Sequence, residues 1–77
     1  MKEKILEICK EVLPFIDMES SDHLVDDGIL DSLAITTLVM ELSVEFDVEF
    51  DLDSLTAGNM NSIDAIVDTV TKLQNSR

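Results

Sequence analysis

The apolar residues of the chain recur at helical spacing in three stretches, and polar connections separate them. In the first stretch one face consists of Ile5, Ile8, Cys9, Val12 and Ile16. Such spacing predicts an amphipathic helix of about three to four turns. Pro14 lacks an amide hydrogen and disfavours helix in the residue before it, so we expect it to tighten or end the last turn.

The strongest helical pattern is LDSLAITTLVMELSVEF, residues 30–46. At 100° per residue, one face collects Ile35, Leu38, Val39, Leu42 and Phe46, and we expect this face in the core. A second apolar stripe, well over about 100° away, consists of Leu33, Met40 and Val44. Either the helix is wedged between two neighbours, or the second stripe is exposed and meets a partner. The spacing alone favours neither interpretation.

The rest of the chain completes a helical pattern. Residues 17–31 form a long acidic loop, for which we expect the anchors Leu24, Val25, Ile29 and Leu30. A short helical turn is predicted from Asp51 or Asp53 to Ala57, and a last helix over 61–73 begins with Asn61 or Ser62 as its N-cap. We therefore predict an all-α fold: a small four-helix bundle with three main helices, a short third one and a long first loop, in a single domain over 1–77.

The distribution of charge narrows the choice of partners. The chain has 17 acidic residues against five Lys and Arg, a net charge of −12, and residues 11–71 contain no Lys or Arg. This field repels nucleic acid and anionic membranes and attracts basic protein patches, unless the acids serve only solubility. No apolar run of about 18 residues and no leader pattern occurs, so we expect a cytoplasmic protein that does not insert into membranes. We also expect a monomer.

Catalytic and metal sites are not predicted. One cysteine, Cys9, and one histidine, His23, cannot form a disulfide or a zinc site of the usual spacing, and we expect the first in the core and the second in solvent. No G-x-S-x-G turn or phosphate-cradling loop is present. A calcium loop starting at Asp47 fails, because its sixth position is Leu52 and its twelfth is Gly58. We therefore expect neither an enzyme nor a dedicated metal site.

The tetrapeptide LDSL occurs twice, around Ser32 and around Ser54. Asp-Ser before an apolar run is most often a helix start. Ser32 lies before four turns of helix, where free amides and the helix dipole favour a phosphate by roughly 0.3–1 kcal/mol. Ser54 precedes only a few helical residues before Gly58. Ser32 is thus the candidate for carrying a phosphate-linked group, and we expect Ser54 to stay unmodified.

GILDSL at 28–33, with the helix that continues into ELSVEFDVEF at 41–50, resembles the acyl carrier protein family, and the resemblance extends over nearly the whole chain. It implies that a phosphopantetheinyl transferase attaches 4′-phosphopantetheine from coenzyme A to Ser32. It implies further that the chain carries acyl groups as thioesters and contributes no catalytic residue. The side chains implied in contacts with basic docking patches of acyl-transferring enzymes are Asp31, Leu33, Met40, Glu41, Val44 and Glu45.

The pathway is open at this point. Carriers of fatty acid synthesis commonly have charged residues where this chain has Ala34 and Thr37, and the lead-in ILDS is similar to D-alanyl carriers of cell-wall modification and to discrete carriers of secondary metabolism. Fatty acid, polyketide or related biosynthesis and D-alanylation are both compatible with the residues. Two rivals from other classes are an unmodified acidic adaptor that uses the second apolar stripe, and a divalent-ion buffer.

Overall fold

Four α-helices and one 3₁₀ turn make up the computed structural model, which describes residues 1–76. They are α1 (Lys2–Val12), α2 (Ser32–Phe46), the 3₁₀ turn η1 (Leu52–Leu55), α3 (Ala57–Met60) and α4 (Ile63–Asn75). All regular structure over residues 1–76 is helical, which confirms the predicted all-α class and the order of long, long, short and long helices.

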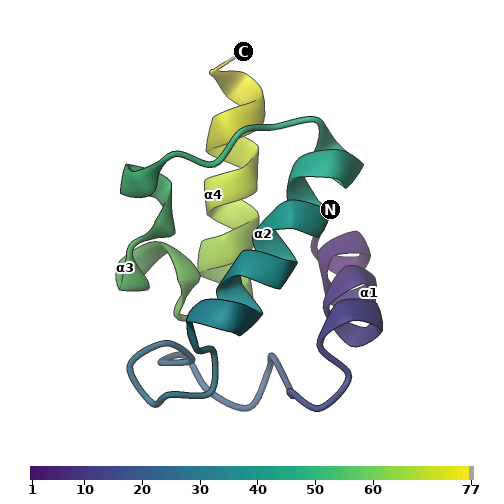
Figure 1. Cartoon of the computed structure of the whole chain (residues 1–77). Coiled ribbons are helices and arrows are strands. Elements are labelled where there is room, and N and C mark those ends of the chain that lie inside the picture. Colours follow the sequence, from purple (N-terminus) through teal and green to yellow (C-terminus); the bar gives the residue numbers. More distant parts are fainter. Residues whose placement is uncertain (77) are drawn as a thin grey trace.

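The core lies where α4 meets the other helices. Helix α4 packs against α1, α2 and α3, and α1 also packs against α2, while the long loop passes beneath the bundle from the end of α1 to the start of α2 (Figure 1). The largest fully buried side chains come from α1, the loop, α2, α3 and α4, and they are Ile5, Cys9, Leu24, Leu30, Leu38, Leu42, Met60, Ile66 and Val70. One small core therefore joins all of these segments.

Helix α1 ends earlier than its apolar pattern suggests. Its last residue is Val12, and Leu13 caps it with a non-helical backbone, as expected for the residue before Pro14. The assignment of Ile16 to the helical face was therefore wrong, because the chain has already left the helix there. Ile16 still packs half-buried against the core, so it keeps the contact but reaches it from the loop.

The buried face of α2 is turned slightly from the predicted one. Its buried residues are Ala34, Leu38 and Leu42, whereas Ile35, Val39 and Phe46 are only partly buried beside them. Small Ala34 was not recognised as core, since an alanine adds little to an apolar pattern. Helix α2 packs against both α1 and α4.

The short third helix is divided in two. Asp51 caps η1 through Ser54 N–H, and α3 then begins at Ala57, where the predicted turn was expected to end. Of the two N-caps proposed for the last helix, Ser62 is the one used, and its hydroxyl accepts from Ala65 N–H at 3.0 Å. Asp64 in the first turn and Lys72 in the last turn of α4 lie as predicted for the helix dipole.

Candidate functional site

Ser32 is the first residue of α2, and Asp31 caps the helix before it. The Asp31 carboxylate accepts Ala34 N–H at 2.8 Å, and the Asp31 carbonyl accepts Ile35 N–H at 2.9 Å. Ser32 itself is exposed. Over residues 1–76, neither its hydroxyl nor the N–H groups of Ser32 and Leu33 have a hydrogen-bond partner. The hydroxyl is thus open to solvent at the positive end of a 15-residue helix.

Ser54 occupies a different place in the second copy of the tetrapeptide. Here the cap is Asp51, so Ser54 is the third residue of η1 instead of the first. Its hydroxyl donates to the Asp51 carboxylate at 2.8 Å, and its N–H donates to the same oxygen at 2.9 Å. These two bonds hold the pKa of Asp51 below its ordinary value. The Ser54 hydroxyl is therefore engaged within the chain, whereas the Ser32 hydroxyl is not.

The loop that leads into Ser32 is held in a closed turn. Leu30 N–H donates to Leu24 carbonyl at 2.8 Å, and Gly28 N–H donates to Val25 carbonyl at 3.0 Å. Gly28 has a φ of +76°, a conformation that glycine adopts without strain. Leu24 and Leu30 are buried, and Val25 and Ile29 are half-buried, which confirms the four predicted anchors. Met18, also buried, is a fifth anchor that the sequence did not reveal.

Asn61, between α3 and α4, is hydrogen-bonded to this loop. Its side-chain oxygen accepts from Val25 N–H at 2.9 Å and from Asp26 N–H at 3.1 Å. Its side-chain nitrogen donates to the Asp26 carboxylate at 3.0 Å, and its carbonyl accepts Leu24 N–H at 2.7 Å. From the sequence, Asn61 was predicted only as a candidate helix cap, because nothing local to it points to a loop more than thirty residues away. It is a positioning residue for the segment before Ser32.

The second apolar stripe of α2 faces solvent. Leu33 is 76% exposed, Met40 65% and Val44 82%. This decides between the two interpretations of the stripe: it is not wedged between neighbouring helices within residues 1–76.

The acidic residues named with that stripe differ in their surroundings. Asp31 serves as the cap of α2, and Glu41 is exposed. Glu45 pairs with Lys4 of α1 at 3.0 Å. The hydrogen bond and the charge of Glu45 raise the pKa of Lys4. One of the expected docking acids is thus already paired inside the molecule.

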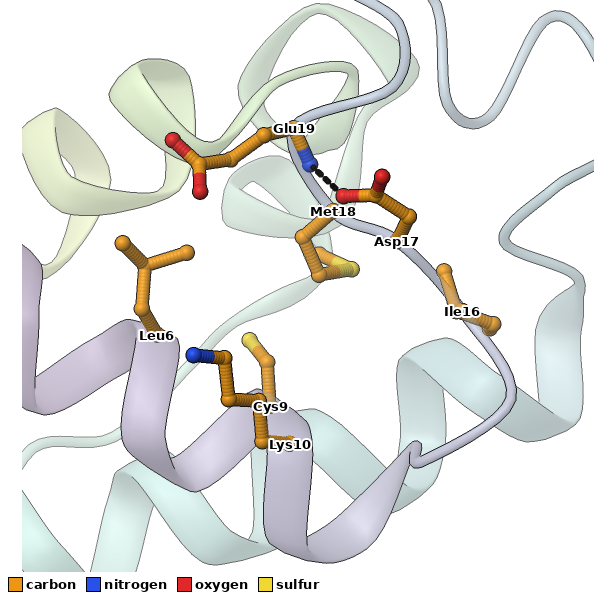
Figure 2. A pocket seen from close by; sticks show the side chains of 7 residues that line it. All are labelled: Leu6, Cys9, Lys10, Ile16, Asp17, Met18 and Glu19. Atoms are coloured by element: carbon orange, nitrogen blue, oxygen red, sulfur yellow. Dashed lines mark hydrogen bonds between the residues drawn. The ribbon is translucent and has the colours of Figure 1, made fainter.

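A pocket of about 200 Å³ lies away from Ser32, between α1 and the start of the loop (Figure 2). The Cys9 thiol and the Met18 side chain line it, and Lys10, Asp17 and Glu19 surround them. Burial raises the pKa of Cys9 to about 11. The thiol is therefore protonated and packed in the core, as expected for Cys9. His23 is exposed on the loop, as expected.

No group of three or more His, Cys, Asp or Glu side chains within residues 1–76 is arranged to hold a metal ion. None of the helices that the structure describes is long and apolar enough to cross a membrane.

The Ser32 site can accept a group but has no base bound to its hydroxyl in the described chain. An exposed, unengaged hydroxyl at a helix N-terminus fits a phosphodiester, because the free N–H groups and the dipole favour an anion there. These features fit a small helical module whose serine another protein could modify.

The comparison with protein families agrees with this class. A family model described as a phosphopantetheine attachment site matches residues 3–70, and the chain belongs to this family, as acyl carrier proteins do. Proteins of this family carry 4′-phosphopantetheine covalently, and this chain is accordingly a carrier and not a catalyst. Its partners are phosphopantetheinyl transferases and acyl-handling enzymes as classes. Searches among curated proteins and among solved structures found no match.

Proposed function

We propose that Ser32 carries the phosphopantetheine of this chain, and that the chain is a discrete acyl carrier for fatty acid, polyketide or related biosynthesis. The observation that carries the proposal is the difference between the two serines. Ser32 is exposed and unengaged at the start of a 15-residue helix, whereas the Ser54 hydroxyl is bonded to Asp51 in a four-residue turn.

The chain's own contribution to the modification is to present a nucleophile. The Ser32 oxygen attacks the phosphorus of coenzyme A that bears the pantetheine. A new phosphodiester bond forms, the pyrophosphate bond breaks, and adenosine 3′,5′-bisphosphate leaves. No base in the described chain contacts the hydroxyl, and we propose that the transferase accepts its proton. Afterwards, the first-turn N–H groups stabilise the new anion by roughly 0.3–1 kcal/mol. When bound, the arm supplies a thiol that holds the acyl group as a thioester.

We also propose the surface through which enzymes recognise the chain. It consists of residues on or next to α2: Asp31, Leu33, Met40, Glu41, Val44 and Glu45. Their exposure, and their position on or directly before the helix that Ser32 begins, support this role. We further propose that the chain is a monomer, because a net charge of −12 makes copies repel one another. We also propose that it is cytoplasmic, with one carrier domain over 1–77.

D-alanine is the second candidate for the acyl group that the chain carries. The observation that favours it is the lack of charge at Ala34 and Thr37, together with the lead-in ILDS. Loading assays separate D-alanyl transfer from fatty acid or polyketide work. If the chain is a D-alanyl carrier, an adenylating ligase with D-alanine and ATP charges the holo protein. If it serves fatty acid or polyketide biosynthesis, a malonyl transferase charges it.

Mass spectrometry of the protein, incubated with coenzyme A and a broad-specificity transferase, tests the attachment. We expect one phosphopantetheine adduct on the wild type and on Ser54→Ala, and none on Ser32→Ala. Loss of the adduct in Ser54→Ala, or its survival in Ser32→Ala, would contradict the assignment. An unmodified adaptor would show no adduct at all, and a divalent-ion buffer would instead show tight, saturable calcium binding by calorimetry.

A further inference from the structure

The lysines and the single cysteine of this chain are the side chains that could take an acyl group from its own arm. A lysine amine forms an amide, and a cysteine thiol exchanges the thioester. Three of the four lysines lie on α1 and one lies in the C-terminal half of α4. They are Lys2, Lys4, Lys10 and Lys72. The loop before Ser32, α2, η1 and α3 thus present acidic, polar and apolar side chains but no amine.

Lys4 is held at the opposite end of α2 from Ser32. Its amine lies 3.0 Å from the Glu45 carboxylate, and Glu45 comes thirteen residues after Ser32, or about 20 Å along the helix axis. The hydrogen bond and the charge of Glu45 raise the pKa of Lys4, and a protonated amine is not a nucleophile. Two more lysines pair with exposed acids: Lys2 with Asp64 at 3.1 Å and Lys72 with Asp68 at 3.2 Å.

Lys10 makes no ion pair within residues 1–76. It lies in the last turn of α1 and lines the pocket between this helix and the start of the loop, together with Asp17 and Glu19 (Figure 2). It follows Lys4 by six residues, or about 9 Å along α1. Lys10 is therefore the native lysine with the least restraint on its amine.

Cys9 is withdrawn from exchange by its burial. Its side chain is 1% exposed, and burial raises the pKa of the thiol to about 11. Exchange of a thioester requires a thiolate that can reach the carbonyl carbon. At neutral pH the folded chain offers neither the charged form of this sulfur nor access to it.

His23 is the remaining nitrogen nucleophile, and it is exposed on the loop. It precedes Leu24, whose carbonyl accepts Leu30 N–H at 2.8 Å, so it belongs to the same closed turn as the segment before Ser32. An imidazole that attacks a thioester forms an acyl-imidazole, which water opens. His23 therefore offers the acyl group no lasting acceptor.

We propose that the placement of these side chains protects the acyl thioester from transfer to the protein that carries it. The inference rests on the proposed attachment of the arm at Ser32 and adds to it a property of the chain's own residues. The lysines are confined to α1 and the end of α4, three of them in ion pairs, and the thiol is buried in the core.

The reaction that this placement avoids is an intramolecular acyl transfer. A neutral lysine amine attacks the thioester carbonyl, an amide bond forms, the carbon–sulfur bond breaks, and the thiol leaves with the proton that the amine gives up. Only about one lysine amine in a thousand is neutral near pH 7.4. A flexible tether nevertheless holds the acyl group at an effective concentration of about 1 mM, so an exposed lysine close to Ser32 would be acylated over time.

Lysines introduced near Ser32 test the inference. A broad-specificity transferase with acetyl-coenzyme A loads the acetylated arm, and gel filtration removes the excess. After incubation at pH 8.5, neutral hydroxylamine cleaves thioesters and leaves amides, which peptide mass spectrometry locates. Thr36→Lys places an exposed amine one turn after Ser32, and His23→Lys places one on the loop. Per loaded molecule, we expect each to form at least about ten times as much acetyl-lysine as the wild type.

The matched controls separate tethered transfer from other acetylation. Asn75→Lys adds an exposed amine about 18 Å along α4 from its first residue, and it should stay at the wild-type level. Adding Ser32→Ala to Thr36→Lys removes the arm and should abolish the acetyl-lysine. The yield in Thr36→Lys should not change when the protein is diluted tenfold, because the transfer is intramolecular.

An exposed thiol gives the corresponding test for Cys9. In Thr36→Cys, peptide mapping after an acid quench and without hydroxylamine should find acetyl on the introduced thiol, at least about ten times as much as on Cys9 in the same molecule. Equal acetylation of the two thiols would show that burial does not protect Cys9. Thermal melting of each variant verifies that the fold is intact.

The outcomes distinguish the inference from the function on which it rests. If the wild type acquires no arm, the carrier proposal itself is wrong and the inference falls with it. If the wild type is loaded normally, but Lys10 is acetylated as strongly as the introduced lysines, the native placement gives no protection. If the loaded variants Thr36→Lys and His23→Lys both stay free of acetyl-lysine, the position of lysines does not matter. Either result overturns the inference and leaves the carrier function standing.

Discussion

Asn61 and Asp26 lie 35 residues apart in the chain, yet the side-chain amide of Asn61 donates to the Asp26 carboxylate at 3.0 Å. The same amide accepts two backbone N–H groups of the loop. The connection before α4 and the segment before Ser32 are thereby one hydrogen-bonded unit. The position of the candidate serine depends on a residue far from it in sequence.

Asn61→Ala removes all three side-chain bonds and leaves two loop N–H groups without their acceptor. We expect the free energy of unfolding to fall by about 1–3 kcal/mol, and the Tm to fall by about 4–8 °C for each kcal/mol. Denaturant unfolding and thermal melting measure the two. Asn75→Ala is the control, because Asn75 is exposed at the end of α4. Equal stability of both variants would show that the Asn61 bonds do not hold the loop.

Asp31 contributes both a capping oxygen and a negative charge at the start of α2, and substitutions can separate the two. Asp31→Ala removes the cap of α2 and should lower the free energy of unfolding by about 1 kcal/mol, whereas Asp31→Ser keeps a capping oxygen and should stay close to the wild type. Chemical denaturation of the three proteins measures the difference. If Asp31→Ser is as unstable as Asp31→Ala, the charge of Asp31 stabilises the helix and the cap contributes little.

The buried thiol of Cys9 makes the fold sensitive to alkali. Its pKa is raised from an ordinary value of 9.0 to about 11, so between these values the unfolded chain loses the thiol proton and the folded chain keeps it. Stability contributed by the neutral thiol is complete below pH 9 and falls as pH rises through this window, by up to about 1.4 kcal/mol per pH unit.

Denaturant unfolding of the wild type and of Cys9→Ala between pH 8 and 11.5 tests this dependence. The variant is expected to start less stable, since it leaves a cavity, but to show a flatter decline above pH 9. A thiol reagent should label native Cys9 at pH 8 about a hundredfold more slowly than the unfolded chain, because the thiolate fraction is that much smaller. Parallel pH profiles of the two proteins would contradict the assignment.

The excess of negative charge should make stability rise with ionic strength. The net charge is −12, and three lysines pair with acids within residues 1–76: Lys2 with Asp64, Lys4 with Glu45 and Lys72 with Asp68. These pairs are exposed, so their loss in salt is small. Screening of the remaining repulsion should dominate and raise the Tm by about 4–8 °C, equivalent to about 1 kcal/mol. A Tm that falls in 0.5 M NaCl would mean that the pairs outweigh the repulsion.

Helix content and the core face of α4 were predictable because both depend on local periodicity. The spacing of Ile63, Ile66 and Val70 placed them correctly in the core, and Ser62 was one of two caps proposed. The errors lie in the buried face of α2, where Ala34 was missed, and at helix boundaries. Ile16 matches the period of α1, but the backbone before Pro14 leaves the helix and no periodic count detects that.

The sequence pointed to one residue for the candidate site, but not to the contacts that hold the loop before it. The resemblance to carrier proteins, carried by GILDSL, pointed to Ser32, and the family model supports the class. Whether Leu33, Met40 and Val44 were buried or exposed could not be decided from spacing, because both arrangements give the same stripe. The pairing of Glu45 with Lys4 could not be predicted either, because it joins α1 and α2, and the spacing within each helix does not show how the two helices pack.

The sequence by itself determined the helical class, the order of the elements, the acidic surface and the family, because periodicity, capping residues, charge and short motifs are properties of neighbouring residues. Only the tertiary structure decided which LDSL serine is unengaged, which α2 stripe faces solvent and how Asn61 holds the loop. The engagement of Ser54 depends on the local backbone of η1, which places its hydroxyl on Asp51. The exposure of the stripe and the Asn61 bonds depend on burial and on contacts between segments distant in the chain, which exist only once the core has brought the segments together.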